Sequence, residues 1–118
     1  MMNNSKYTRQ VYGWDREVTS IQYLPVLPIS KLRNWAKNIW EEECPKKPMP
    51  KIVAGRGIRY MNEYMSFSQK NLIVLSRHQR NKLILLHEMC HCFGTDREID
   101  HGPTFQNRYA TLLFKYML

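Results

Sequence analysis

Cysteine is scarce in this chain, and long apolar runs are absent from it. The 118 residues contain three cysteines, Cys44, Cys90 and Cys92, and none of them forms a Cys-x-x-Cys pair. An odd count without paired spacing excludes a disulfide framework and fits a reducing compartment. No apolar stretch is long enough to span a membrane, and the N-terminal residues MMNNSKYTRQ contain no apolar run of the kind that signal peptides need. We therefore expect an intracellular, cytoplasmic protein without membrane contacts.

Acidic residues are also few. The chain has 10 Asp and Glu residues against 18 Lys and Arg residues, so its formal net charge is +8. Such an excess of cations favours contact with polyanions, of which nucleic acid is the first candidate, and agrees with a nuclear or DNA-associated location. Small basic proteins without any such partner are common, so the charge makes DNA a candidate partner and no more. The sequence leaves the oligomeric state open.

The most informative stretch that is present covers residues 83–94, LILLHEMCHCFG, with His87, Glu88 and His91 in the order H-E-x-x-H. Two histidines four residues apart lie on one face of a helix and can bind the same metal ion. Glu88, rotated by about 100° around the helix axis, would lie beside that ion as a general base. The apolar residues before the motif indicate a buried helix, where these polar groups are costly unless paired or metal-bound. The alternative is a core helix with two hydrogen-bonded histidines.

A catalytic zinc site needs a third protein ligand and an open position for water. The metzincin pattern would place a third histidine where this chain has Arg97, and a thermolysin-like site needs a glutamate on a later helix, although none follows Glu98. His101 is the only histidine after the motif, and Pro103 next to it suits the first turn of a new helix. We therefore favour His101 as the third ligand, because imidazole is a preferred zinc ligand.

Other ligands stay open at this point. Asp96, Glu98 and Asp100 are rival oxygen ligands in the polar loop before His101. A thiolate from Cys90 would give a closed, structural zinc site, although a buried cysteine usually acts as a small apolar residue. The fourth histidine, His78, is expected on the surface near the start of the motif helix.

The rest of the chain predicts one α+β domain over residues 1–118. We expect an irregular lead-in over residues 1–28, because its β-prone residues follow no clear period. A helix with Ser30 as its N-cap should follow, since apolar residues recur at helical spacing until Cys44 and Pro45. Strands are predicted at residues 51–54, 57–61, 64–67 and 71–75, with a hairpin across Asn62 and Glu63. They should form a small, mainly antiparallel sheet of three to four strands, followed by the motif helix and a C-terminal helix.

The motifs HEMCH (residues 87–91) and HGPTF (residues 101–105), with the strand NLIVLS before the first, resemble those of the SprT-like zinc peptidases. This family includes bacterial SprT and the DNA-repair protease Spartan, and the resemblance covers roughly residues 30 to 117. It implies a zincin-like minimal domain in which His87, His91 and His101 bind Zn²⁺ and Glu88 is catalytic. The cysteine-pair zinc ribbon of many members has no counterpart in these residues. The parts that bring Spartan to DNA lie outside its protease domain and have no counterpart either.

The sequence thus predicts a zinc metallopeptidase in which Glu88 activates a zinc-bound water for attack on a peptide bond, with nucleic-acid-bound proteins as candidate substrates. Tyr109 and Arg108 are candidate donors to the oxyanion, ahead of Tyr60 and Tyr64. The alternative is a basic nucleic-acid-binding module with a structural or vestigial zinc site. A zinc hydrolase acting on something other than peptides is a third interpretation.

Overall fold

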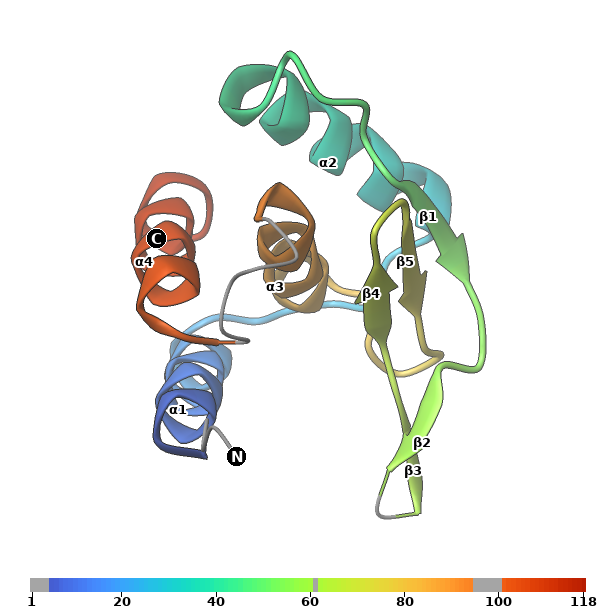
Figure 1. Ribbon diagram of the computed structural model, residues 1–118. Coiled ribbons are helices and arrows are strands. Elements are labelled where there is room, and N and C mark those ends of the chain that lie inside the picture. Colours follow the sequence, from blue (N-terminus) through green and yellow to red (C-terminus); the bar gives the residue numbers. More distant parts are fainter. Residues whose placement is uncertain (1–4, 61, 95–100) are drawn as a thin grey trace.

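The computed structural model describes residues 5–60, 62–94 and 101–118. It has the α+β architecture that the sequence predicted (Figure 1). The helices are α1 (Ser5–Ile21), α2 (Ile29–Glu43), α3 (Lys82–Phe93) and α4 (Pro103–Tyr116). The strands are β1 (Lys51–Ala54), β2 (Ile58–Tyr60), β3 (Glu63–Met65), β4 (Phe67–Gln69) and β5 (Leu72–Leu75). None of the described helices has the length and apolarity that a membrane span requires.

The strands form one three-stranded sheet in the order β1-β5-β4 and a separate hairpin of β2 with β3. The β4–β5 and β2–β3 pairings are antiparallel, whereas β1 pairs with β5 in parallel, with Lys51 opposite Leu72. The predicted mainly antiparallel sheet is therefore confirmed. The parallel pair was not predicted. A parallel pair needs a long crossover connection, and here the hairpin and β4 supply it. The strand expected at residues 64–67 is split between β3 and β4.

Helix α3 lies at the centre of the molecule, with the sheet on one side and α4 and α1 on the other (Figure 1). Its sequence is apolar on nearly all sides, which is typical of a helix buried within a domain. Leu85, Leu86, Met89 and Cys90 are fully buried. The core thus holds the motif helix in place from several directions.

Helix α2 packs its apolar stripe inward as predicted, with Leu32, Ala36, Ile39 and Trp40 buried. The Trp40 ring stacks on Phe93 at the end of α3, with ring centroids 4.4 Å apart, so this tryptophan is part of the core. The prediction of Ser30 as N-cap is wrong. The N-cap is Pro28, two residues earlier and in an extended conformation, and the helix begins at Ile29.

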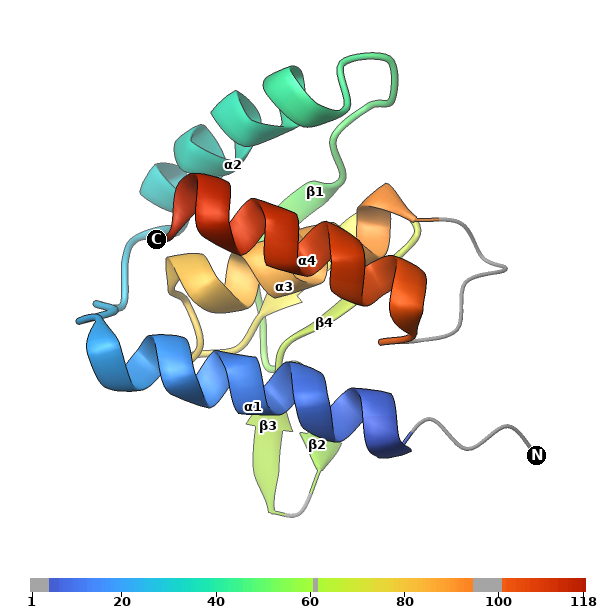
Figure 2. The same ribbon diagram turned by 90° about the vertical axis from the view of Figure 1, so that its left-hand side faces the viewer.

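The predicted irregular lead-in over residues 1–28 is wrong between Ser5 and Ile21, where the chain forms α1. Residues 22–28 are irregular, as expected, and residues 1–4 lie outside the described part of the chain. Valine, tryptophan and tyrosine have only modest helix propensity, which tertiary packing often overrides. Here Val11 and Val18 are buried in the core, seven residues apart on one face of α1. Figure 2 shows α1 running along the surface below α3 and α4.

Candidate metal centre

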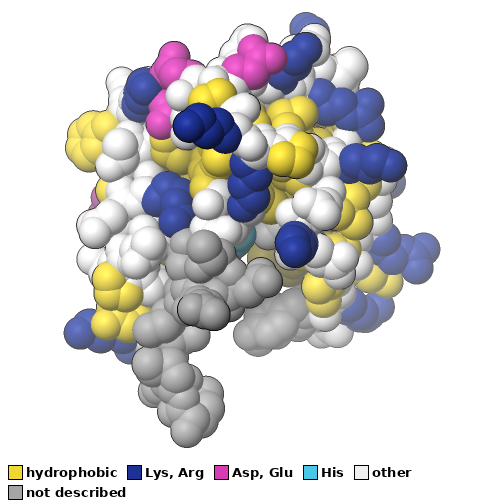
Figure 3. All heavy atoms as spheres, turned by 45° about the horizontal axis from the view of Figure 1, so that its top comes forward, with side chains coloured by type: hydrophobic (Ala, Val, Ile, Leu, Met, Phe, Trp, Pro, Cys, Tyr) yellow, Lys and Arg dark blue, Asp and Glu magenta, His cyan; other side chains and the backbone are white. Residues whose placement is uncertain are grey.

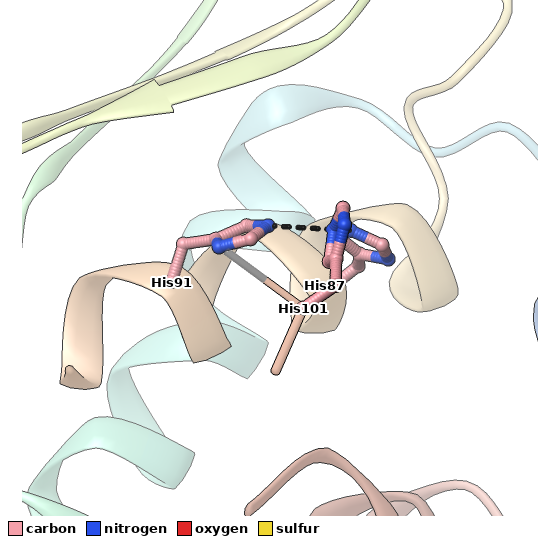
Figure 4. Close-up of side chains that lie close together, drawn as sticks. All are labelled: His87, His91 and His101. Atoms are coloured by element: carbon pink, nitrogen blue, oxygen red, sulfur yellow. Dashed lines mark hydrogen bonds between the residues drawn. The ribbon is translucent and has the colours of Figure 1, made fainter. Parts of the chain in front are cut away.

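Helix α3 presents His87 and His91 on one face, as the motif predicted (Figure 4). The helix begins where the Asn81 side chain accepts a hydrogen bond from the Ile84 amide, and Gly94 is its C-cap. Ser76 lies buried directly after β5, where its amide donates to the Ser66 hydroxyl.

His101 joins the two motif histidines from the other side. Its Nε2 lies 3.0 Å from Nε2 of His87 and 3.1 Å from Nε2 of His91. The side chain is 5% exposed, and the backbone has a φ of 57°, in the left-handed region that residues other than glycine seldom adopt. Such a conformation persists only where the surroundings impose it. The structure therefore brings together the three histidines that the sequence singled out (Figure 4).

The spacing of these nitrogens fits a metal ion. Two nitrogens bound to one tetrahedral Zn²⁺ at about 2.0–2.1 Å lie about 3.3 Å apart, and the observed separations are 3.0 and 3.1 Å. The three side chains form the metal-ligand group found among the described residues. Their chemistry does not identify the ion, because Mn²⁺, Co²⁺ and Ni²⁺ also bind imidazole.

Asp15, on α1, orients the first ligand. Its Oδ2 lies 3.1 Å from Nδ1 of His87, in a buried contact between residues 72 positions apart. The other carboxylate oxygen accepts a hydrogen bond from the Tyr109 hydroxyl. A carboxylate can only accept, so the Nδ1 of His87 carries the proton and its Nε2 presents a lone pair. This is the arrangement that holds metal-binding histidines in other proteins.

Two more side chains from α1 reach the centre. The Thr8 hydroxyl oxygen lies 3.3 Å from Nδ1 of His101. The Tyr12 ring stacks on His87 with centroids 5.8 Å apart and meets His101 edge-on at 5.5 Å. Helix α1 therefore provides one contact surface for two of the three ligands.

Sequence reasoning missed Asp15, Thr8 and Tyr12. The available signal was the spacing of Thr8, Val11, Tyr12, Asp15 and Val18, which follows the i, i+3, i+4, i+7 pattern of a helix face. Two of these five residues are polar, so a search for apolar periodicity alone finds no clear period.

The surroundings of His91 favour the form that binds metal. Burial, reinforced by the neighbouring imidazoles of His87 and His101, lowers the pKa of His91 to about 3. An imidazole with so low a pKa is neutral at pH 7, and only the neutral ring can act as a ligand.

The cysteines near the motif belong to the core. Cys90 is fully buried, and burial raises the pKa of its thiol far above the ordinary value, so it stays protonated. Cys92 is also buried and has a pKa raised to about 11 by burial. Both behave as small apolar side chains, as expected for Cys90. The rival oxygen ligands Asp96, Glu98 and Asp100 lie outside the described residues.

The structure gives the candidate oxyanion donors other contacts. The Tyr109 hydroxyl is buried and donates to Asp15, and Arg108 donates from Nη1 to the Cys90 carbonyl at 2.9 Å. Tyr64 lies on the hairpin, where Arg56 and Arg59 approach its ring. The side chain of Tyr60 lies outside the described residues. His78 is exposed in the turn before α3, on the surface as predicted.

Glu88 is half-buried and lines a hollow of about 490 Å³ together with His87. The carboxylate of Glu88 and the candidate ligand His87 therefore lie on the wall of one hollow. Comparison with protein-family models, curated proteins and solved structures finds no match to this chain.

Proposed function

We propose that this protein is a zinc-dependent peptidase of the SprT-like kind. The observation that carries the proposal is the convergence of three histidines: Nε2 of His101 lies 3.0 Å from Nε2 of His87 and 3.1 Å from Nε2 of His91. Glu88 lines a hollow beside them. The order of elements also supports it, since α3 is followed by a ligand at the start of α4.

In this proposal His87, His91 and His101 hold one Zn²⁺. The ion, when bound, supplies a Lewis acid that acidifies water and polarises a carbonyl group. Asp15 keeps the His87 ring in the orientation and tautomer that binding requires. Glu88 accepts a proton from the attacking water and later passes it to the amine that leaves.

The position of Glu88 favours catalysis over a purely structural metal site. Structural zinc sites are closed by four protein ligands, whereas catalytic sites use three and keep one position open. The ligand group in the described residues has three members. A carboxylate on the wall of a hollow that His87 also lines suits a general base, which a structural site does not need.

The test is the Glu88→Gln variant, which preserves the shape of the side chain but cannot accept the proton. We expect it to retain about one zinc per chain by elemental mass spectrometry and to lose cleavage of fluorescently labelled casein by at least about a hundredfold. The matched control is Glu41→Gln, which makes the same change at an exposed position on α2. Undiminished cleavage by Glu88→Gln would overturn the mechanism.

Binding to nucleic acid is the second candidate function, and the net charge of +8 favours it. Lys and Arg side chains are spread over the face in Figure 3, while Asp and Glu gather at its upper edge. If the protein is a nucleic-acid-binding module, its DNA affinity should fall steeply with salt concentration and it should cleave no protein. A peptidase acting on DNA-bound proteins predicts cleavage that DNA stimulates. Measuring casein cleavage and DNA binding over a salt series separates the two.

A further inference from the structure

The hollow beside Glu88 is lined by residues of α1, of the β2–β3 hairpin and of α3. Figure 1 shows α1 and the hairpin both below α3. Four large apolar side chains from three parts of the fold line it: Tyr12 from α1, Ile58 and Met65 from the hairpin, and Ile84 from α3. His87 and Glu88 also line the hollow, so it borders the candidate metal centre. A cavity of about 490 Å³ is in the range of small-ligand sites.

The hairpin presents its apolar residues to this hollow by its register. Ile58 and Met65 are directly paired across the two strands, so their side chains lie on the same face of the hairpin. Ile58 is nevertheless 56% exposed, and Tyr12 across the hollow is 39% exposed. Large apolar side chains left open to solvent around a concave site are typical of ligand-binding surfaces.

Two polar residues of the wall, Ser66 and Gln79, belong to one hydrogen-bond network. The Ser66 amide donates to Oε1 of Gln79 at 2.6 Å, and the Ser76 amide donates to the Ser66 hydroxyl at 2.8 Å. The Gln79 Nε2 donates to the Met65 sulfur at 3.8 Å. This network ties the hairpin to the turn after β5 and engages the hydrogen-bonding groups of Ser66 and Gln79 on that side of the hollow.

We propose that the hollow is the specificity pocket of the peptidase and takes a large, uncharged apolar side chain, such as Leu, Met or Phe, next to the peptide bond that is cut. This inference rests on the proposed function, because His87 and Glu88 belong to the same wall. The carboxylates of Asp15 and Glu88 repel an acidic side chain, and the apolar walls disfavour burial of an ammonium group. Ile58 and Met65 are the specificity-determining residues.

Binding of small hydroxamates to the zinc-loaded full chain tests the pocket without relying on turnover. Two sets of hydroxamates place one variable side chain (Ala, Leu, Phe, Asp or Lys) on the amino or the carboxyl side of the metal-binding group. In the set that reaches the hollow, we expect Leu and Phe to bind at least about tenfold more tightly than Ala, Asp or Lys by calorimetry. Acetohydroxamate, whose methyl group is too small to fill the hollow, reports whether the metal centre is intact.

The decisive variant is Ile58→Lys, which places a cation on the pocket wall at an exposed strand position. It should lower the ratio of Leu to Asp affinity by at least about tenfold, with acetohydroxamate affinity measured on the same sample as the reference for the metal centre. The matched control is Ile21→Lys, the same change at an isoleucine that is 70% exposed at the end of α1. It should preserve the wild-type preference.

The outcomes separate the two proposals. If acetohydroxamate and all other hydroxamates fail to bind, both the proposed metal centre and the proposed pocket are overturned. If they bind with equal affinity in both sets, or if Ile58→Lys leaves the preference unchanged, the pocket proposal is overturned while the proposed function stands. A preference for Lys would likewise overturn it, since the carboxylates would then dominate the apolar walls.

Discussion

The two helices that meet at the metal centre, α3 and α1, are held in place in different ways. Helix α3 is surrounded by the sheet, α2 and α4, and residues on nearly every side of it are buried. Helix α1 lies on the surface and buries one face, through residues such as Val11, Asp15 and Val18. The candidate ligands His87 and His91 therefore lie on a helix that is buried on nearly every side. The groups that orient the histidines come from an element with fewer contacts.

This difference predicts a gradient of effects between the two helices. Changes to α3 should remove the metal or unfold the chain, and changes to the polar groups of α1 should weaken binding by degrees. Four measurements probe that gradient.

The largest effect is expected for the ligands themselves. His91→Ala removes an Nε2 that lies 3.1 Å from that of His101, so two imidazoles remain to hold the ion. We expect zinc content, measured by elemental mass spectrometry on untagged protein, to fall from about one per chain to a small fraction, and His101→Ala to behave alike. His78→Ala, at an exposed histidine before α3, is the control and should keep full zinc. Full zinc content in His91→Ala would show that the metal binds at another site.

The second comparison concerns stability. Leu85→Ala on α3 removes a fully buried side chain from the centre of the core and should lower the free energy of unfolding by about 2–5 kcal/mol. Val11→Ala on α1 removes two carbons from a site that is also fully buried, and should cost about 2 kcal/mol. Urea unfolding in the presence of zinc measures both. An equal or larger loss for Val11→Ala would show that α1 is held as firmly as α3.

Asp15 tests whether α1 acts on the metal centre. Asp15→Ala leaves the His87 Nδ1–H and the Tyr109 hydroxyl without their shared acceptor, so we expect zinc affinity to fall by about 10- to 100-fold. Asp15→Asn keeps the size of the side chain and one acceptor oxygen, and should lose less. Glu17→Ala removes a carboxylate from an exposed position on the same helix and should leave affinity unchanged. Equal affinities in all three variants would exclude an orienting role for Asp15. Competition with a zinc chelator gives these affinities.

Thr8 should have the smallest effect. Thr8→Val keeps the shape of the side chain but removes the hydroxyl that lies 3.3 Å from Nδ1 of His101. A long, partly buried hydrogen bond contributes about 0.5 kcal/mol, so zinc affinity should fall by about two- to threefold. A loss as large as that of Asp15→Ala would mean that His101 depends on α1 as strongly as His87 does.

Local sequence patterns account for much of what was predicted correctly about the fold and the candidate site. The i, i+4 spacing of His87 and His91, the apolar residues around them and the stop at Gly94 are all features of one helix, and the structure has that helix where the sequence placed it. The apolar stripe of α2 and the β2–β3 hairpin are likewise short-range features, although Glu63, expected in the turn, is the first residue of β3 and pairs with Tyr60. His101 was selected by ligand type, and its Nε2 does converge with the other two.

The motif helix, the candidate ligands and the α+β class follow from the sequence, because each depends on neighbours within a few turns or on ligand chemistry. The parallel pairing of β1 with β5 and the contact of Asp15 with His87 across 72 positions of chain depend on tertiary packing. The helical form of α1 gains its stability from packing rather than from propensity. Contacts between distant segments depend on how whole elements pack, and no local pattern records that.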